Sequence, residues 1–195
     1  MPIPAKLTDK RYTLADLHAW MEEGRCELID GFPYMLAAPS HVHQLISADI
    51  LSQLREFVRG GSCKVMASPV DVHLFAEDGD APEDVDTVVQ PDLIVVCDRS
   101  KKIPGGCRGA PDLVMEILSP STKRWDQTMK LSLYEEAGVR EYWLIDPETR
   151  FVTVYKLENG RFGKPEAYAG SVRVPVGIFN GCAVDMESAY DYAEW

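Results

Sequence analysis

Two carboxylates in the sequence lie where they could hold a metal ion. Glu116 interrupts the apolar run LVMEIL (residues 113–118), and a charged side chain inside a buried strand is rare unless it forms an ion pair or binds a metal. Asp92 begins the preceding apolar run, PDLIVVCD (residues 91–98), and pairing of the two strands would bring it beside Glu116. Two carboxylates and a backbone carbonyl suit a hard, oxygen-binding cation such as Mg²⁺. The alternative for Glu116 is an ion pair with a Lys or Arg.

Asp112 repeats the PDL triplet of Asp92 but is not a candidate ligand. Four strand residues at about 3.3 Å each separate its Cα from that of Glu116 by roughly 13 Å. The two side chains cannot hold one small ion together, so we interpret Asp112 as a strand-end residue.

A lysine on the following helix is a candidate partner for these carboxylates. Asp126, Lys130 and Tyr134 are spaced i, i+4, i+8 and therefore share one helix face. If the helix folds back over its strand, the Lys130 ammonium can reach Asp92 and Glu116, where it could orient an attacking water or stabilise developing negative charge. The alternative is a solvated stripe stabilised by an Asp126–Lys130 pair.

These residues need a sheet and helices to position them. The hydrophobic period predicts helices over 13–23, 40–59 and 122–137. A hairpin with an Asp30-Gly31 turn is predicted over 26–38, and central strands covered on both faces are predicted near 91–98 and 111–119. Further strands are expected near 65–74 and at 141–146, followed by a β-rich tail over 151–195. This order predicts an α/β fold with a mixed sheet flanked by helices, an N-terminal helix-hairpin and a β-rich C-terminal tail.

Composition sets the broad class of the protein. The 195 residues fit a single domain over 1–195, and 46% apolar residues can form a core. The sequence contains neither an apolar run long enough to cross a membrane nor a signal-peptide pattern, so we expect a cytoplasmic protein with no membrane partner. The five cysteines are odd in number and never occur as C-x-x-C, which predicts reduced, mostly buried thiols.

Several spaced motifs together resemble one nuclease family. The strings QPDLIVV, GAPDLVMEILSPST, D-x-x-x-K-x-x-x-Y-x-x-x-G-V and EYWLIDP, with ELIDG and HQLI upstream, are similar to the Uma-two family of the PD-(D/E)XK nuclease superfamily. The resemblance spans about residues 12–157. It implies a restriction-endonuclease-like fold and a metal-dependent endonuclease that hydrolyses phosphodiester bonds in DNA with Mg²⁺, or with Mn²⁺ in its place.

The resemblance also implies roles for individual residues. Asp92 and Glu116 become the acidic motif residues and metal ligands, and the backbone carbonyl of Ile117 becomes a third ligand. The superfamily's usual Lys two residues after the acid is Leu118 here, so Lys130 would supply that lysine from the helix.

Two upstream residues complete the site that the resemblance implies. Glu27 would be an additional acidic catalytic residue, although a surface charge on the hairpin is the alternative. His43 would line the site, although it could instead be a packed or capping histidine.

The net charge of −11 disfavours a polyanionic substrate, but the charge is unevenly distributed. Residues 99–130 contain seven basic and three acidic residues, a net charge of +4. We therefore expect a phosphate-binding rim around the site. The predicted substrate contacts are His43, Arg99, Lys101, Lys102, Arg108, Lys123, Arg124 and Tyr134.

Two other functions stay open. The fold could serve a catalytically weak or inactive nucleic-acid-binding or regulatory protein, or a hydrolase of small phosphate esters. A homodimer is expected by analogy with restriction-type nucleases, and the aromatic tail (Tyr190, Tyr192, Trp195) could cover either its interface or the protein's own core.

Overall fold

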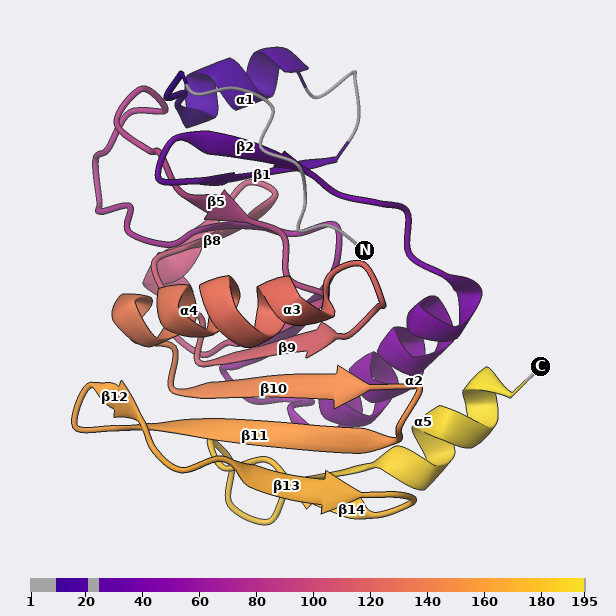
Figure 1. Ribbon diagram of the computed structural model, residues 1–195. Helices are drawn as coiled ribbons and strands as arrows, with labels where there is room; N and C mark the ends of the chain where they lie inside the picture. The colour runs from indigo at the N-terminus through magenta and orange to yellow at the C-terminus, as the bar shows by residue number, and fades with distance from the viewer. Residues whose placement is uncertain (1–9, 21–24, 195) are drawn as a thin grey trace.

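The computed structural model describes residues 10–20 and 25–194 and contains a mixed sheet with helices on both faces (Figure 1). The strand order of this main sheet is β12-β11-β10-β9-β6-β3, and β13 pairs with β11. Strands β9 and β10 are parallel, while the other neighbours are antiparallel. The strands are β3 (Lys64–Ala67), β6 (Leu93–Val96), β9 (Leu113–Ile117), β10 (Glu141–Asp146), β11 (Phe151–Glu158), β12 (Arg161–Phe162) and β13 (Glu166–Ala169).

A second sheet, with the order β2-β1-β5-β4-β8-β7, lies above the main sheet in Figure 1. Its first two strands form the predicted hairpin, and Asp30 and Gly31 both have positive φ in its turn. Strands β14 and β15 form a separate pair. The bounds are β1 (Cys26–Ile29), β2 (Phe32–Met35), β4 (Asp71–His73), β5 (Val88–Val89), β7 (Lys102–Ile103), β8 (Gly106–Arg108), β14 (Arg173–Pro175) and β15 (Ala183–Asp185).

Helices cover the two faces of the main sheet. Helices α2 (His41–Phe57) and α5 (Met186–Ala193) lie on one face, and α3 (Lys123–Trp125) and α4 (Leu131–Ala137) lie on the other, drawn just above β9 in Figure 1. Helix α1 (Leu14–Trp20) packs on β1, and a 3₁₀ turn, η1 (Arg99–Lys101), precedes β7. In the described part of the chain, no helix is both long and apolar enough to cross a membrane.

Strand alternation directs Glu116 toward α3 and α4. Met115 and Ile117 belong to the core cluster on the α2 side, whereas Val114 and Leu118 belong to the cluster on the α4 side. Because successive side chains of a strand point to opposite faces, Glu116 shares the side of Val114. The apolar residues of LVMEIL therefore fill two cores, and its single charge enters the α4 side.

Two predicted segments, the helix over 122–137 and the β-rich tail, are present but differ in detail from the prediction. The predicted helix over 122–137 contains a π-helical segment, η2 (Asp126–Lys130), between α3 and α4. The tail, predicted to be β-rich, also contains helix α5, where Tyr190 is buried in the protein's own core and Tyr192 is exposed. Trp195 lies outside the described residues.

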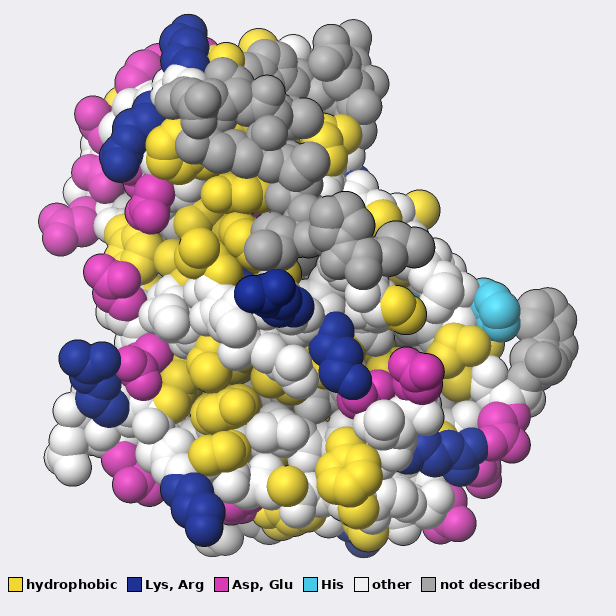
Figure 2. Space-filling model, viewed as in Figure 1, with side chains coloured by type: hydrophobic (Ala, Val, Ile, Leu, Met, Phe, Trp, Pro, Cys, Tyr) yellow, Lys and Arg dark blue, Asp and Glu magenta, His cyan; other side chains and the backbone are white. Residues whose placement is uncertain are grey.

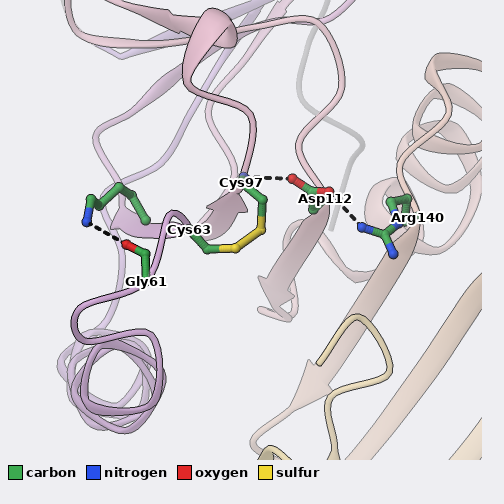
Figure 3. Close-up of a disulfide and its surroundings, with 6 residues drawn as sticks. Gly61, Cys63, Cys97, Asp112 and Arg140 are labelled. Carbon is green, nitrogen blue, oxygen red and sulfur yellow. Dashed lines mark hydrogen bonds and ion pairs between the residues drawn. A yellow bond between two sulfur atoms is a disulfide. The ribbon is translucent and has the colours of Figure 1, made fainter. Parts of the chain in front are cut away.

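The prediction that all five cysteines are reduced is wrong, because Cys63 and Cys97 form a disulfide (Figure 3). Antiparallel pairing of Lys64 with Val96 places these two residues side by side at the ends of β3 and β6. Their sequence separation of 34 gives no sign of this contact. The other cysteines, Cys26, Cys107 and Cys182, are free and buried as predicted.

Candidate active site

Asp92 lies beside Glu116 at one end of two inner strands of the main sheet. The antiparallel register pairs Leu93 with Met115. Asp92 directly precedes Leu93 and Glu116 directly follows Met115, so Asp92 and Glu116 are neighbours. Oδ2 of Asp92 accepts a hydrogen bond of 2.7 Å from the backbone N–H of Ile117 and lies 2.9 Å from Nε2 of His43. Every hydrogen bond that described residues make to the Asp92 carboxylate falls on Oδ2, which leaves Oδ1 available.

Lys130 joins two buried carboxylates from different sheets. Its Nζ lies 2.9 Å from Oε1 of Glu116 in the main sheet and 2.9 Å from Oε1 of Glu27 in β1, and 3.8 Å from Oδ1 of Asp126. The side chains of this group are at most 5% exposed. Glu27 also accepts from the backbone N–H of Gln90 at 2.9 Å. Glu27 is therefore not a surface charge of the hairpin.

The π-helical segment η2 and the following helix α4 direct three side chains inward. Asp126, Lys130 and Tyr134 are all buried, so the alternative of a solvated stripe is wrong. The Tyr134 hydroxyl donates to Oε1 of Glu116 at 2.9 Å, and the Tyr142 hydroxyl donates to the backbone carbonyl of Asp126 at 3.1 Å. One helical segment and its neighbours thus fix the position of Glu116 and its lysine.

Burial and charge shift the pKa values of this group. Burial raises the pKa of Glu116 well above its ordinary value, although Lys130 opposes the shift. Burial likewise raises the pKa of Asp126 to about 6. Burial of Lys130 opposes its charge, but the surrounding carboxylates outweigh burial and raise its pKa well above the ordinary value. Lys130 therefore stays protonated, while Glu116 and Asp126 take up protons more readily than ordinary carboxyl groups.

A cleft of about 500 Å³ exposes one side of this group. Its walls come from the chain that leaves the β1–β2 hairpin, from the start of α2 and from the loops after β9 and β10. Among the residues considered so far, those that line it are His43, Gln90, Asp92, Glu116, Ile117, Leu118, Lys123, Asp126 and Lys130. Lys130 is only slightly exposed there, and Glu27 lies behind it.

The structure does not bring most of the predicted basic rim to this cleft. Asp92 lies at the start of β6 and Glu116 near the end of β9. The connection over residues 97–112 joins the other ends of these two strands, and it therefore starts and finishes away from Asp92 and Glu116. That connection contains four of the predicted substrate contacts, Arg99, Lys101, Lys102 and Arg108, and none of them lines the cleft. On the face drawn in Figure 2, Lys and Arg side chains are spread among acidic ones.

Two of these four residues have partners elsewhere. Lys101 donates to the backbone carbonyl of Ala110 at 2.6 Å, and Arg108 lies 2.7 Å from Asp78.

The four remaining predicted substrate contacts have different surroundings. His43 lines the cleft beside Asp92. Lys123 lines the cleft and pairs with Asp146 at 2.6 Å. Arg124 is exposed and does not line the cleft. Tyr134 is completely buried, so its position fits a residue that holds Glu116 rather than one that contacts substrate.

Sequence reasoning missed Arg25 and Gln90, which both line the cleft. Arg25 precedes Glu27 by two residues, and alternation along an extended chain places such residues on one side. The spacing of Arg25 and Glu27 could therefore have predicted that Arg25 lies near the site. The role of Gln90 depends on contacts between segments distant in the sequence, which no local pattern reports.

The acidic residues fit a divalent cation that is completed by other oxygens. Within the part of the chain that the structure describes, no three or more His, Cys, Asp and Glu side chains form a complete metal cluster. The described residues bond only to Oε1 of Glu116 and Oδ2 of Asp92, and Oε2 of Glu27 is buried without a partner in the structure. Mg²⁺ commonly uses one or two carboxylates and takes its other ligands from water and phosphate. The donor set matches that preference.

Comparisons with known proteins identify relatives over most of the chain. The model of the Uma2 family, described as "Putative restriction endonuclease", matches residues 14–187. An uncharacterised protein of Synechocystis sp., slr1290, is 26% identical over 163 residues, which cover 82% of this chain and 78% of that protein. A solved structure from Anabaena variabilis, a putative nuclease of DUF820, has a TM-score of 0.70 at 20% identity and covers 93% of this chain and 98% of its own. The similarity to that structure establishes the fold.

Proposed function

Because the chain belongs to the Uma2 family, we propose that it is a metal-dependent endonuclease that hydrolyses phosphodiester bonds in DNA. One observation carries the proposal: Asp92 and the buried Glu116–Lys130 pair lie at a common cleft, each carboxylate with one oxygen free of bonds from described residues. A protein rarely keeps several carboxylates around one buried lysine, because burial of unpaired charge costs several kcal/mol. A bound cation would offset that cost.

Asp92, Glu116 and the backbone carbonyl of Ile117 are the residues that would hold Mg²⁺ or Mn²⁺. When bound, the ion supplies positive charge that polarises a phosphate oxygen and favours deprotonation of water. The backbone N–H of Ile117 and the ring of His43 hold Asp92, and Lys130 and Tyr134 hold Glu116. Each of the two carboxylate ligands is thus fixed through its other oxygen.

Lys130 acts in this proposal as a fixed positive charge. Its raised pKa keeps it protonated at neutral pH, so it is not a general base. It lines the cleft beside Glu116, where an ammonium stabilises negative charge that develops on a phosphate. Glu27, buried behind Lys130, holds the ammonium in position.

Matched variants of the two PDL triplets test the assignment. We expect Asp92→Asn to abolish nicking of plasmid DNA in Mg²⁺ or Mn²⁺. Asp112→Asn should leave nicking intact, because Asp112 lies at the other end of β9, where it accepts from Cys97 and Arg140. Circular dichroism would verify that both variants are folded. Equal activity of wild type and Asp92→Asn would contradict the proposal.

The size of the substrate is tested separately. The cleft volume is within the range of sites for small ligands, which favours a hydrolase of small phosphate esters as the second candidate. Turnover of mononucleotide esters without turnover of DNA would favour it. A homodimer stays a prediction, and light scattering that detects only a 21.8 kDa species would contradict it.

A further inference from the structure

The cleft contains a cation whose charge no acidic side chain of the described residues neutralises. Lys123 pairs with Asp146, Lys130 pairs with carboxylates on several sides, and His43 contacts Asp92. Arg25 also lines the cleft, but no described carboxylate lies within 4.0 Å of its guanidinium. Its positive charge therefore remains available to an anion in the cleft.

Arg25 is held by neutral partners in a fixed orientation. Its Nε donates to Oε1 of Gln90 at 3.1 Å, and one terminal nitrogen donates to Oγ of Ser68 at 2.5 Å. The described residues form no hydrogen bond with its second terminal nitrogen, Nη1. A guanidinium with free N–H donors and an unpaired charge matches the geometry of phosphate oxygens.

Gln90 fixes this arrangement and connects it to the acidic group. Its side-chain Nε2 donates to Oδ1 of Asp71 at 2.8 Å, which leaves Oε1 to accept from Arg25. An ionised carboxylate only accepts hydrogen bonds, so Asp71 determines which way the Gln90 amide points. The backbone N–H of Gln90 donates to Glu27. One residue thus positions both Arg25 and the carboxylate that holds Lys130.

We propose that Arg25 binds a backbone phosphate of the nucleic acid in the cleft, with Gln90 as its positioning residue. This inference rests on the proposed function. Five acidic side chains, Asp92, Glu116, Asp126, Asp146 and Glu148, line the same cleft and would repel a phosphodiester. An arginine that no described carboxylate neutralises opposes that repulsion from the wall of the cleft and gives the backbone a defined attachment point.

Salt-dependent DNA binding tests the proposal. Affinity for a fluorescent DNA duplex would be measured by anisotropy at several NaCl concentrations in Ca²⁺, with gels to verify that the duplex stays intact. We expect Arg25→Gln to weaken binding roughly 10- to 100-fold at low salt. Loss of one phosphate contact should also reduce the slope of log K against log[salt] by about 0.9. Arg25→Lys should keep the slope of the wild type, because it keeps the charge.

Arg55→Gln is the matched control. Arg55 is an exposed arginine of α2, twelve residues after His43 and therefore about 18 Å further along the helix. Its substitution changes the net charge equally, so we expect affinity and slope to stay near the wild-type values.

The outcomes separate this inference from the proposed function. If Arg25 only stabilises the fold, Arg25→Gln lowers the unfolding midpoint but leaves the salt slope unchanged, which overturns the inference. If wild type binds DNA and the salt slope of log K is the same for Arg25→Gln as for Arg55→Gln, the inference about Arg25 is overturned, while the nuclease proposal stands. If the wild type does not bind DNA, the proposed substrate and this inference are both wrong.

Discussion

Replacement of Lys130 by methionine tests the charge balance of the candidate site. Lys130 is the cation that the buried carboxylates Glu116 and Glu27 share, each at 2.9 Å, with Asp126 at 3.8 Å. Methionine has a similar length but no charge, so the variant leaves these carboxylates without their cation. Removal of one partner from a buried ion pair costs about 3–5 kcal/mol. A domain has only about 5–15 kcal/mol of stability, so we expect a large loss.

The cost of this substitution should increase with pH. The raised pKa of Lys130 keeps the wild-type lysine charged throughout the range. Burial raises the pKa values of Glu116 and Asp126, the latter to about 6, so both carboxyls take up protons more readily than ordinary ones. A protonated carboxyl needs no cation. The destabilisation in Lys130→Met should therefore be smaller at about pH 5 than at about pH 8.

Urea unfolding followed by circular dichroism measures both effects. Lys123→Met is the matched control, because Lys123 pairs with Asp146 at 2.6 Å while its side chain is 39% exposed. A pair this exposed contributes less than about 1 kcal/mol. Equal destabilisation by the two substitutions, or a Lys130→Met cost that does not change with pH, would refute the reasoning.

Three further predictions concern neighbouring groups. Burial raises the pKa of Asp126 from 3.8 to about 6, so the native state binds a proton that the unfolded state releases and stability falls as pH rises through this interval. Asp126→Asn removes that loss, so the free energy of unfolding of the variant, measured with urea and relative to wild type, should increase by about 3 kcal/mol between about pH 3 and pH 7. A difference between variant and wild type that does not change with pH would contradict this. Tyr134→Phe removes the hydroxyl that donates to Glu116 and should cost about 1.5–3 kcal/mol in the same assay, whereas no change would show that this hydrogen bond is unimportant. Reduction of the Cys63–Cys97 disulfide should cost about 3–4 kcal/mol, from the entropy of a loop closed over a separation of 34 residues. Unfolding with and without reductant measures this cost, and Cys63→Ser should be insensitive to reductant.

Local patterns were sufficient to predict the elements that carry Asp92, Glu116 and Lys130. Alternation within LVMEIL determines that Glu116 points away from Met115 and Ile117, and helical spacing places Lys130 near Asp126 and Tyr134. The predicted pairing of the strands that carry Asp92 and Glu116 is confirmed, and the structure adds that β6 and β9 are antiparallel. These features depend on a few residues along one segment, so the sequence predicts them.

Strand direction explains why the basic rim was misplaced. The net charge over residues 99–130 carries no information on strand direction. The chain runs away from the site along β6, after Asp92, and comes back to it along β9, where it reaches Glu116. Arg99 and Lys102 are near the candidate site in sequence but lie at the far end of both strands. The pairing of Cys63 with Cys97 was missed for a related reason, because it depends on the register of β3 and β6.

The sequence by itself determined the family, the two central strands, the acidic pair and the lysine on the following helix. Only the tertiary structure decided which charges meet: Glu27 comes from a different sheet to share Lys130 with Glu116, and Arg25 enters the cleft through contacts with Gln90 and Ser68. The physical reason is the range of each interaction. Hydrophobic period and helical spacing act within one segment, whereas burial and charge pairing depend on how distant segments pack, and these determine the chemistry of the cleft.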